Sequence, residues 1–240
     1  MEKHGERGPL VGRTVALGLC LALMPGGALA ACRLALLLAL DVSSSVDAIE
    51  DRLQREGLAK ALVSAPVAAA LLERPGAPVG LAVYEWSGRY RQTVVLPWQM
   101  IESENDLATA AADIAASPRS TDQFPTALGY ALGYAAGMFR NGPDCLTRKL
   151  DVSGDGVTNE GFGPALAYAN FPLEGVTVNG LVIGSEAAVM DHYRTDVIRG
   201  PGAFAMAADS YADYEDAMRR KLLREIGTQV LGRVSTGPAD

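Results

Sequence analysis

Apolar residues gather in short runs that are separated by segments of helical periodicity. The run at 33–40 is apolar at nearly every position, which predicts a parallel strand covered on both faces. Further strands are expected at 79–86, 91–97, 147–152, 175–183 and 202–207. The turn Ser87-Gly88-Arg89 joins two of them closely, so strand 91–97 is expected to be antiparallel to its neighbour and to lie at a sheet edge.

Helices are expected between these strands. Asp47 and Glu50 have the spacing of a capping box, and the apolar residues of the helix that follows recur near one face: Ile49, Leu53, Leu58 and Leu62. The other helices are expected at 105–116, 126–139, 163–170, 186–198 and 211–226. This alternation predicts an α/β fold with three layers, a doubly wound and mostly parallel central sheet with one antiparallel edge strand.

The N-terminus has the pattern of a signal peptide. Basic residues precede the apolar run at 14–24, and Ala28-Leu29-Ala30 fits cleavage after small residues. The run is short for a membrane span, and the alternative is a buried N-terminal helix. We expect a signal peptide at 1–30, one domain at 31–228 and a frayed tail at 229–240, and therefore a periplasmic or secreted protein.

Cysteine usage leaves two outcomes open. Cleavage after residue 30 removes Cys20 and leaves Cys32 and Cys145, an even number that suits an oxidising compartment. However, Leu29-Ala30-Ala31-Cys32 also resembles the lipobox of bacterial lipoproteins, which would make Cys32 a lipid anchor. A disulfide and a lipid at Cys32 exclude each other.

Charge narrows the class of partner. The 240 residues include 21 basic and 28 acidic side chains, a formal net charge of −7. Nucleic acid is not expected as a partner, because phosphate binding needs a basic face. A cation, or a partner with a basic patch, suits this balance better.

Oxygen-bearing side chains follow two of the predicted strands. Asp41, Ser43 and Ser45 form D-x-S-x-S after the first strand, Asp155 stands in S-G-D-G after a later one, and Thr126 opens a predicted helix. Ligands of open α/β sheets bind beyond the carboxyl ends of the strands, where these groups would converge. Carboxylates and hydroxyls are hard donors that suit Mg²⁺.

The order of these groups resembles the metal-ion-dependent adhesion site of von Willebrand A domains, and the resemblance covers nearly all of residues 33–228. Within that fold family the chain is similar to an uncharacterised group of exported proteobacterial proteins, through Glu85-Trp86-Ser87-Gly88 and the segments 151–156, 179–181 and 200–204.

The resemblance implies a divalent cation, Mg²⁺ or else Mn²⁺ or Ca²⁺. Ser43, Ser45 and Thr126 would contact it directly, and Asp41 and Asp155 would bind directly or through water. One coordination position would stay open for an acidic group of a protein or peptide. Phe124-Pro125 stand where the common pattern has a glycine pair, so Thr126 is the ligand that the resemblance supports least.

The same fold implies that the first strand and strand 147–152 are parallel neighbours. Cys32 precedes Asp41 by nine residues and Cys145 precedes Asp155 by ten. If both aspartates lie at one end of the sheet, both cysteines lie at the other. The resemblance thus favours a Cys32–Cys145 disulfide over free thiols or a lipid at Cys32.

An enzyme is not expected. The chain after residue 30 has one histidine, His192, on a predicted surface helix, and it lacks G-x-S-x-G and the phosphate-binding loop. We expect a cation-dependent binding module; the alternative is an interaction scaffold whose site is degenerate or structural and holds no functional metal. Glu85 and Ser87 are expected at the rim of the site, or else within a plain hairpin.

Overall fold

The computed structural model describes Met1 and residues 32–227, so the expected tail at 229–240 and the expected signal peptide, Met1 apart, lie outside the described residues. The described chain forms a six-stranded sheet in the order β3-β2-β1-β4-β5-β6. Its strands are β1 Leu34–Asp41, β2 Val79–Trp86, β3 Gln92–Ile101, β4 Arg148–Gly154, β5 Val176–Ile183 and β6 Ala205–Ala208. Only β3, at one edge, runs antiparallel to its neighbour within this sheet.

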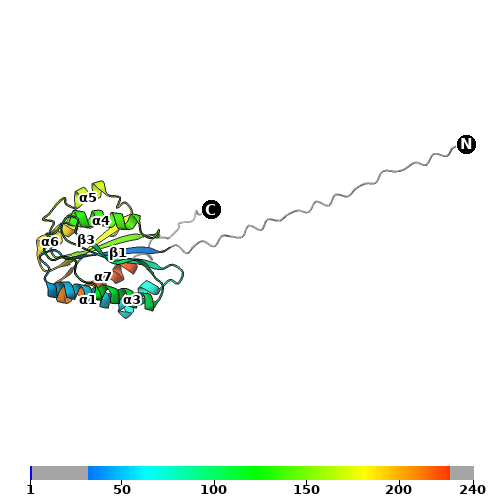
Figure 1. Ribbon diagram of the computed structural model, residues 1–240, viewed down its shortest axis with the longest axis horizontal. Helices are drawn as coiled ribbons and strands as arrows, with labels where there is room; N and C mark the ends of the chain where they lie inside the picture. Colours follow the sequence, from blue (N-terminus) through cyan, green and yellow to red (C-terminus); the bar gives the residue numbers. More distant parts are fainter. Residues whose placement is uncertain (2–31, 228–240) are drawn as a thin grey trace, which may run out of the picture.

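Helices cover both faces of the sheet (Figure 1). One layer contains α1 Ala48–Val63, α2 Ala65–Leu72, α3 Glu104–Ala116 and α7 Tyr214–Gly227; the other contains α4 Leu128–Arg140, α5 Pro164–Asn170 and α6 Ala187–His192. The side chains of β1 alternate between the layers, with Leu36 and Leu38 in the first core and Leu37 and Ala39 in the second. The predicted α/β architecture with one antiparallel edge strand is confirmed.

Some helical details were predicted wrongly. Ile49 is 58% exposed, because it precedes Leu58 by nine residues and therefore lies on the opposite side of α1 from the buried face that holds Leu58 and Leu62. The short helix α2 was not predicted at all. The helix expected at 186–198 is divided into α6 and a π-helix, Tyr193–Val197.

The π-helix has a packing cause. It buries Tyr193 and Val197 completely against the sheet. A Cβ on Gly180 of β5 would lie 2.4 Å from the Tyr193 ring, so only glycine admits the ring at this position. The π-helical turn thus occurs where the Tyr193 ring packs against β5 at a position without a side chain, Gly180.

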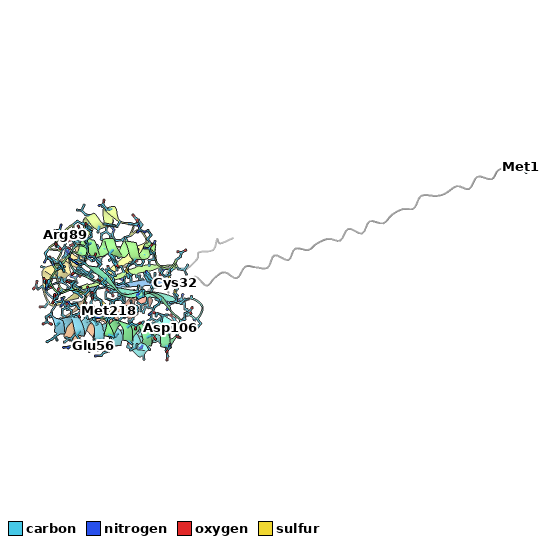
Figure 2. The ribbon with its side chains drawn as sticks, in the orientation of Figure 1. Met1, Cys32, Glu56, Arg89, Asp106 and Met218 are labelled. Carbon is cyan, nitrogen blue, oxygen red and sulfur yellow. A yellow bond between two sulfur atoms is a disulfide. The ribbon has the colours of Figure 1, made fainter. Side chains whose placement is uncertain are left out.

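The expected disulfide is present. Cys32 and Cys145 are bonded, with their Cα atoms 4.4 Å apart, at the start of the neighbouring strands β1 and β4. The thiol of Cys32 is therefore not free for a lipid anchor. Figure 2 shows Cys32 and Arg89, which follows β2, at opposite ends of the molecule. None of the helices within the described residues is long and apolar enough to cross a bilayer.

Candidate metal centre

Asp41 ends β1, which is buried along its whole length, and its surroundings fix its orientation. Its Oδ1 accepts a hydrogen bond from the Ser43 amide at 2.7 Å, and its carbonyl oxygen accepts one from the Gln54 side chain at 2.9 Å. The Oδ2 atom is buried and has no hydrogen-bond partner. A fully buried carboxylate oxygen without a partner is costly, so this atom marks a place where a cation fits.

Three further side chains gather beside Asp41. Ser45 Oγ donates to Asp155 Oδ1 at 2.8 Å, and the Ser43 and Ser45 hydroxyls are 3.1 Å apart. The two segments meet because β1 and β4 are parallel neighbours, with Leu40 level with Ser153. The carboxyl ends of both strands therefore present their polar groups to one space.

Thr126 reaches the same space from the segment before α4. It is 4% exposed, and a Cβ on Gly156 would lie 3.4 Å from its Oγ1, so the hydroxyl lies against the turn that carries Asp155. Asn159 holds its backbone at two points: Thr126 N donates to Asn159 Oδ1 at 2.8 Å, and Asn159 N donates to the Thr126 carbonyl at 3.0 Å. The structure thus brings together all five side chains that the sequence singled out.

The electrostatics of the cluster favour a cation. Burial raises the pKa of Asp41 to about 7, and the nearby Asp155 carboxylate adds to the rise, while Ser43 and Arg119 oppose it. Burial also raises the pKa of Asp155. Two partly desolvated carboxylates that repel each other are stabilised by a positive ion between them.

The donor set suits a hard cation. It comprises two carboxylates and three hydroxyls, which are the oxygen ligands that Mg²⁺, Mn²⁺ and Ca²⁺ accept. Within residues 32–227 no group of three or more His, Cys, Asp and Glu side chains could hold a metal ion. A cation in this cluster would therefore depend on its hydroxyls and on water for much of its coordination.

Tyr193 and Gly154 belong to the site although the sequence did not point to them. A Cβ on Gly154 would lie 2.9 Å from Asp41 Oδ2 and 2.6 Å from the Tyr193 hydroxyl, which is buried and has no hydrogen-bond partner. Burial raises the pKa of Tyr193 well above its ordinary value, so the phenol stays protonated. It is a neutral group beside the carboxylate of Asp41.

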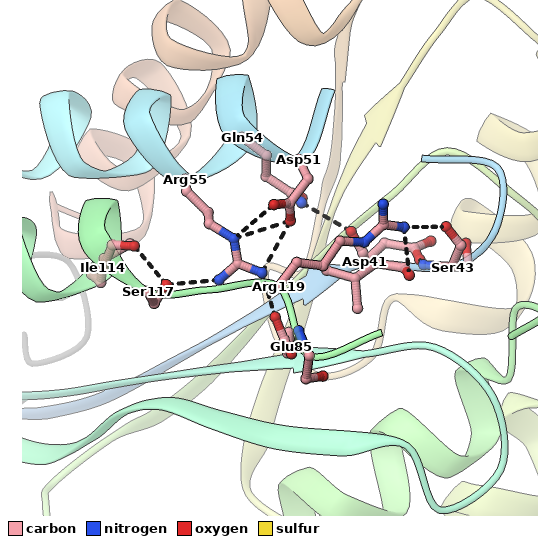
Figure 3. A network of polar contacts seen from close by, with 11 residues as sticks. Asp41, Ser43, Asp51, Gln54, Arg55, Glu85, Ile114, Ser117 and Arg119 are labelled. Carbon is pink, nitrogen blue, oxygen red and sulfur yellow. Dashed lines mark hydrogen bonds and ion pairs between the residues drawn. The ribbon is translucent and has the colours of Figure 1, made fainter. Parts of the chain in front are cut away.

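Glu85 is not at the rim, as the sequence suggested, but in a buried network behind the site (Figure 3). It is 1% exposed and forms an ion pair with Arg55, which also binds Asp51 and the Ser117 hydroxyl. The other oxygen of Glu85 accepts a hydrogen bond from the Ser120 amide at 2.8 Å. The network fastens the segment that precedes Thr126 to α1 and β2.

Arg119, in that segment, holds the loop after β1. Its guanidinium donates to the carbonyl oxygens of Val42 and Ser43, both at 3.0 Å. Figure 3 shows Arg119 beside Asp41 and Ser43. The loop with D-x-S-x-S is thus tied to the segment that leads to Thr126.

Several exposed apolar residues lie near the cluster in sequence. Ser87 is completely buried, contrary to its expected place at the rim. Tyr90, Ile49 and Val157 are 83%, 58% and 41% exposed, respectively. Each of these side chains belongs to a segment next to the cluster of candidate ligands. Exposed apolar surface is therefore found near this polar cluster.

His192 is not the solvated residue that the sequence suggested. Its side chain is 14% exposed; Nδ1 lies 2.8 Å from Asp196 Oδ2, and Nε2 accepts from the Thr158 amide at 3.3 Å. It therefore supports the loop that carries Asp155 and Asn159.

Comparisons with known proteins agree with this architecture. The family model described as "Protein of unknown function (DUF1194)" matches residues 31–230. A search of curated proteins found no match.

Solved structures with this fold include von Willebrand A proteins. Proximal thread matrix protein 1 from the mussel byssus, with a zinc-occupied MIDAS motif, is 17% identical with a TM-score of 0.62, over 82% of this chain and 48% of that one. A von Willebrand factor type A protein from Catenulispora acidiphila is 17% identical with a TM-score of 0.59, over 82% and 43%. The pilus adhesin SpaC from Lactobacillus rhamnosus GG is 12% identical with a TM-score of 0.59, over 82% and 31%. The chain spans less than half the length of these three neighbours, and at these identities they show its von Willebrand A fold.

Proposed function

The chain belongs to the DUF1194 family of proteins of unknown function, and we propose that it is an exported, divalent-cation-dependent binding protein that captures an acidic group of a protein or peptide partner. One observation carries the proposal: a buried, unpartnered carboxylate oxygen, Asp41 Oδ2, within a cluster of two carboxylates and three hydroxyls at the carboxyl ends of two parallel strands.

The cation would be held by this chain's own oxygen atoms. Ser43, Ser45 and Thr126 would contact it directly, and Asp41 and Asp155 directly or through water. The zinc-occupied motif of the mussel protein supports a metal at such a site, and the hardness of the present donors favours Mg²⁺, Mn²⁺ or Ca²⁺ over zinc. When bound, the cation supplies positive charge and an open coordination position for a carboxylate.

Binding rather than catalysis is proposed because the cluster lacks the groups of a hydrolase. His192 pairs with Asp196 and Thr158 and is bonded to no serine. In the proposed site Asp41 and Asp155 would both serve the cation, so neither would act as a general acid or base. Exposed Tyr90, Ile49 and Val157 suit contact with a protein surface.

Export is proposed from the disulfide and from the signal-like N-terminus. Structural disulfides persist in oxidising compartments such as the periplasm, and Cys32 and Cys145 form a disulfide. We place the protein in the periplasm or outside the cell.

Thermal unfolding tests the cation. A ligand that binds only the folded state raises stability as its concentration exceeds Kd. The domain after residue 30 is expected to melt several degrees higher in millimolar Mg²⁺ or Mn²⁺ than in a chelator, and Asp155→Asn is expected to remove that difference. If the melting temperature is identical in Mg²⁺, Mn²⁺, Ca²⁺ and chelator, the proposal is wrong, and the alternative function, an interaction scaffold without a functional metal, is supported.

A further inference from the structure

Strand β4 has an unusual polar face. Leu150 and Val152 point into the core beneath α4, as a buried strand requires. The alternate residues Lys149, Asp151 and Ser153 are also buried, and their contacts are with α7. A row of buried polar side chains under a helix needs an explanation, because apolar residues would normally fill such positions.

At the centre of this row three charged side chains meet in a space closed to solvent. Lys221 Nζ of α7 lies 2.6 Å from Asp151 Oδ1 and 2.7 Å from Glu225 Oε1, and all three side chains are 0% exposed. Asn179 of β5 donates to the same Glu225 oxygen at 2.7 Å and so fixes that carboxylate. The Phe204 ring lies 5.4 Å from Nζ.

The contact between Lys221 and Asp151 differs from an ordinary buried ion pair. Apart from Lys221 Nζ, which lies 2.6 Å from Oδ1, neither carboxylate oxygen of Asp151 has a partner among the described residues. A buried ion pair compensates for lost hydration only when hydrogen bonds satisfy its atoms. The lysine nitrogen is thus the one polar group beside a carboxylate whose other lone pairs are unsatisfied, and it lies close enough to react.

We propose that Lys221 and Asp151 form an intramolecular isopeptide bond, with Glu225 as the catalytic residue that moves the protons. The site needs no cofactor, because the three side chains hold all the reacting atoms. It is separate from the proposed cation site, and it stands or falls independently of it.

The reaction is a condensation that balances with one water. Glu225 takes a proton from the Lys221 ammonium, which frees the lone pair of Nζ. Nζ attacks Cγ of the protonated Asp151 carboxyl group and forms the new C–N bond. Glu225 returns its proton to a hydroxyl on Cγ. The C–O bond then breaks and water leaves. The second nitrogen proton passes to Glu225. The ammonium of Lys221 and the neutral carboxyl group of Asp151 thus become one secondary amide and one water molecule, and the remaining proton stays on Glu225.

The surroundings favour this product. Burial raises the pKa of Asp151 to about 7, with the Glu225 charge adding to the rise and Lys221 opposing it, so the neutral carboxyl that Nζ attacks is accessible. In the product, a neutral amide and a protonated Glu225 also replace the buried charges of Lys221 and Glu225, which removes their desolvation cost.

The bond would be a second covalent cross-link within the domain. It would link β4 to α7, whereas the disulfide links β1 to β4. The last helix of the described domain would then be fixed covalently to the centre of the sheet, in a form that reducing agents leave intact.

Intact-mass spectrometry of the reduced, denatured full chain, expressed in an exporting host, tests the proposal. The expected mass is one water below that of the sequence with the observed N-terminus. Proteolysis is expected to give a branched fragment that joins the Asp151 and Lys221 peptides, with no tryptic cleavage after Lys221. The full mass with two separate linear peptides would overturn the proposal. Loss of water at Asp155-Gly156 through a succinimide would overturn it too, because the peptides would remain separate.

Two variants test the chemistry. Glu225→Gln keeps the size of the side chain but removes the proton acceptor, and Lys221→Met removes the nucleophile; both are expected to have the full mass. A branched peptide that persists in Glu225→Gln would refute the role of Glu225. The peptide map of the wild type alone shows whether the isopeptide bond is present. Poor folding of a variant therefore cannot obscure that result.

Discussion

Asp41 belongs to a motif that is recognisable in the sequence, but the residues that surround its side chain cannot be predicted from the sequence. The order D-x-S-x-S, Thr126 and S-G-D-G is visible along the chain, and for that reason the sequence alone indicates the five candidate ligands. The buried partners of these residues come from distant segments. Glu85 was expected at the rim because the second strand ends at the metal face, but its pairing with Arg55 spans 30 residues and has no local signal.

Asp41→Asn tests the electrostatic strain of the cation-free site. The folded-state pKa of Asp41 is raised from 3.8 to about 7, so the folded protein holds this proton more tightly than the unfolded chain. Its contribution to stability is full below about pH 4 and is lost as the pH rises to about 7. At pH 8 in a chelator, the amide is expected to raise the free energy of unfolding by about 1–3 kcal/mol.

Urea unfolding at pH 8 and at pH 4 measures this difference. At pH 4, where Asp41 is protonated in the folded state, the variant and the wild type are expected to be similar. A variant that is less stable than the wild type at pH 8 without cation would show that the ionised carboxylate is already satisfied.

Asn159→Ala tests the two-point support of Thr126. The substitution removes the acceptor for the Thr126 amide, and groups that orient metal ligands typically change affinity by about 10–100-fold. We expect Mn²⁺ affinity to fall within that range while the melting temperature in chelator changes little. Asn170→Ala, which removes a side-chain hydrogen bond on α5, is the matched control. Equal affinities in the two variants would remove Asn159 from the site.

At the scale of elements, periodicity predicted the six strands and most helices, since each has a strong local pattern. The exceptions have different causes. The π-helix depends on the fit of Tyr193 against Gly180, two residues that no local pattern connects. Helix α2 has a local start signal, Ser64 at its N-cap and Pro66 in its first turn, but it follows α1 without a break in the apolar pattern that would mark a second helix.

Cys32→Ser tests the link between β1 and β4. Loss of a native disulfide typically costs about 2–5 kcal/mol, and this bridge joins the starts of two central strands. The free energy of unfolding is expected to fall by that amount, while the cation-induced shift in melting temperature persists because the metal centre lies at the other end of both strands. Wild-type protein that is equally stable with and without reductant would contradict the stabilising role.

At the scale of the whole molecule, the alternation of strands and helices predicted the layers. The same alternation placed two polar segments at one end of the sheet and two cysteines at the other. What alternation could not predict is the interior of the α7 layer, where Asp151, Lys221 and Glu225 are buried together. Charged residues on a helix are normally taken as its exposed face, and only the packing of α7 shows otherwise.

The protein as a whole presents a polar centre with apolar neighbours on an acidic molecule. With a formal net charge of −7, it would repel an acidic partner at long range. A cation at the centre is therefore what makes capture of a carboxylate physically reasonable, because it reverses the local charge.

Calorimetric titration of Mn²⁺ into the domain after residue 30 tests this central claim most directly. The account predicts one bound ion per chain, with no binding to Asp41→Asn or Asp155→Asn that is folded by circular dichroism. Glu186→Gln, which changes a neighbouring charge outside the five ligands, is expected to retain the ion. The absence of binding to the wild type, or binding that survives both aspartate substitutions, would contradict the account.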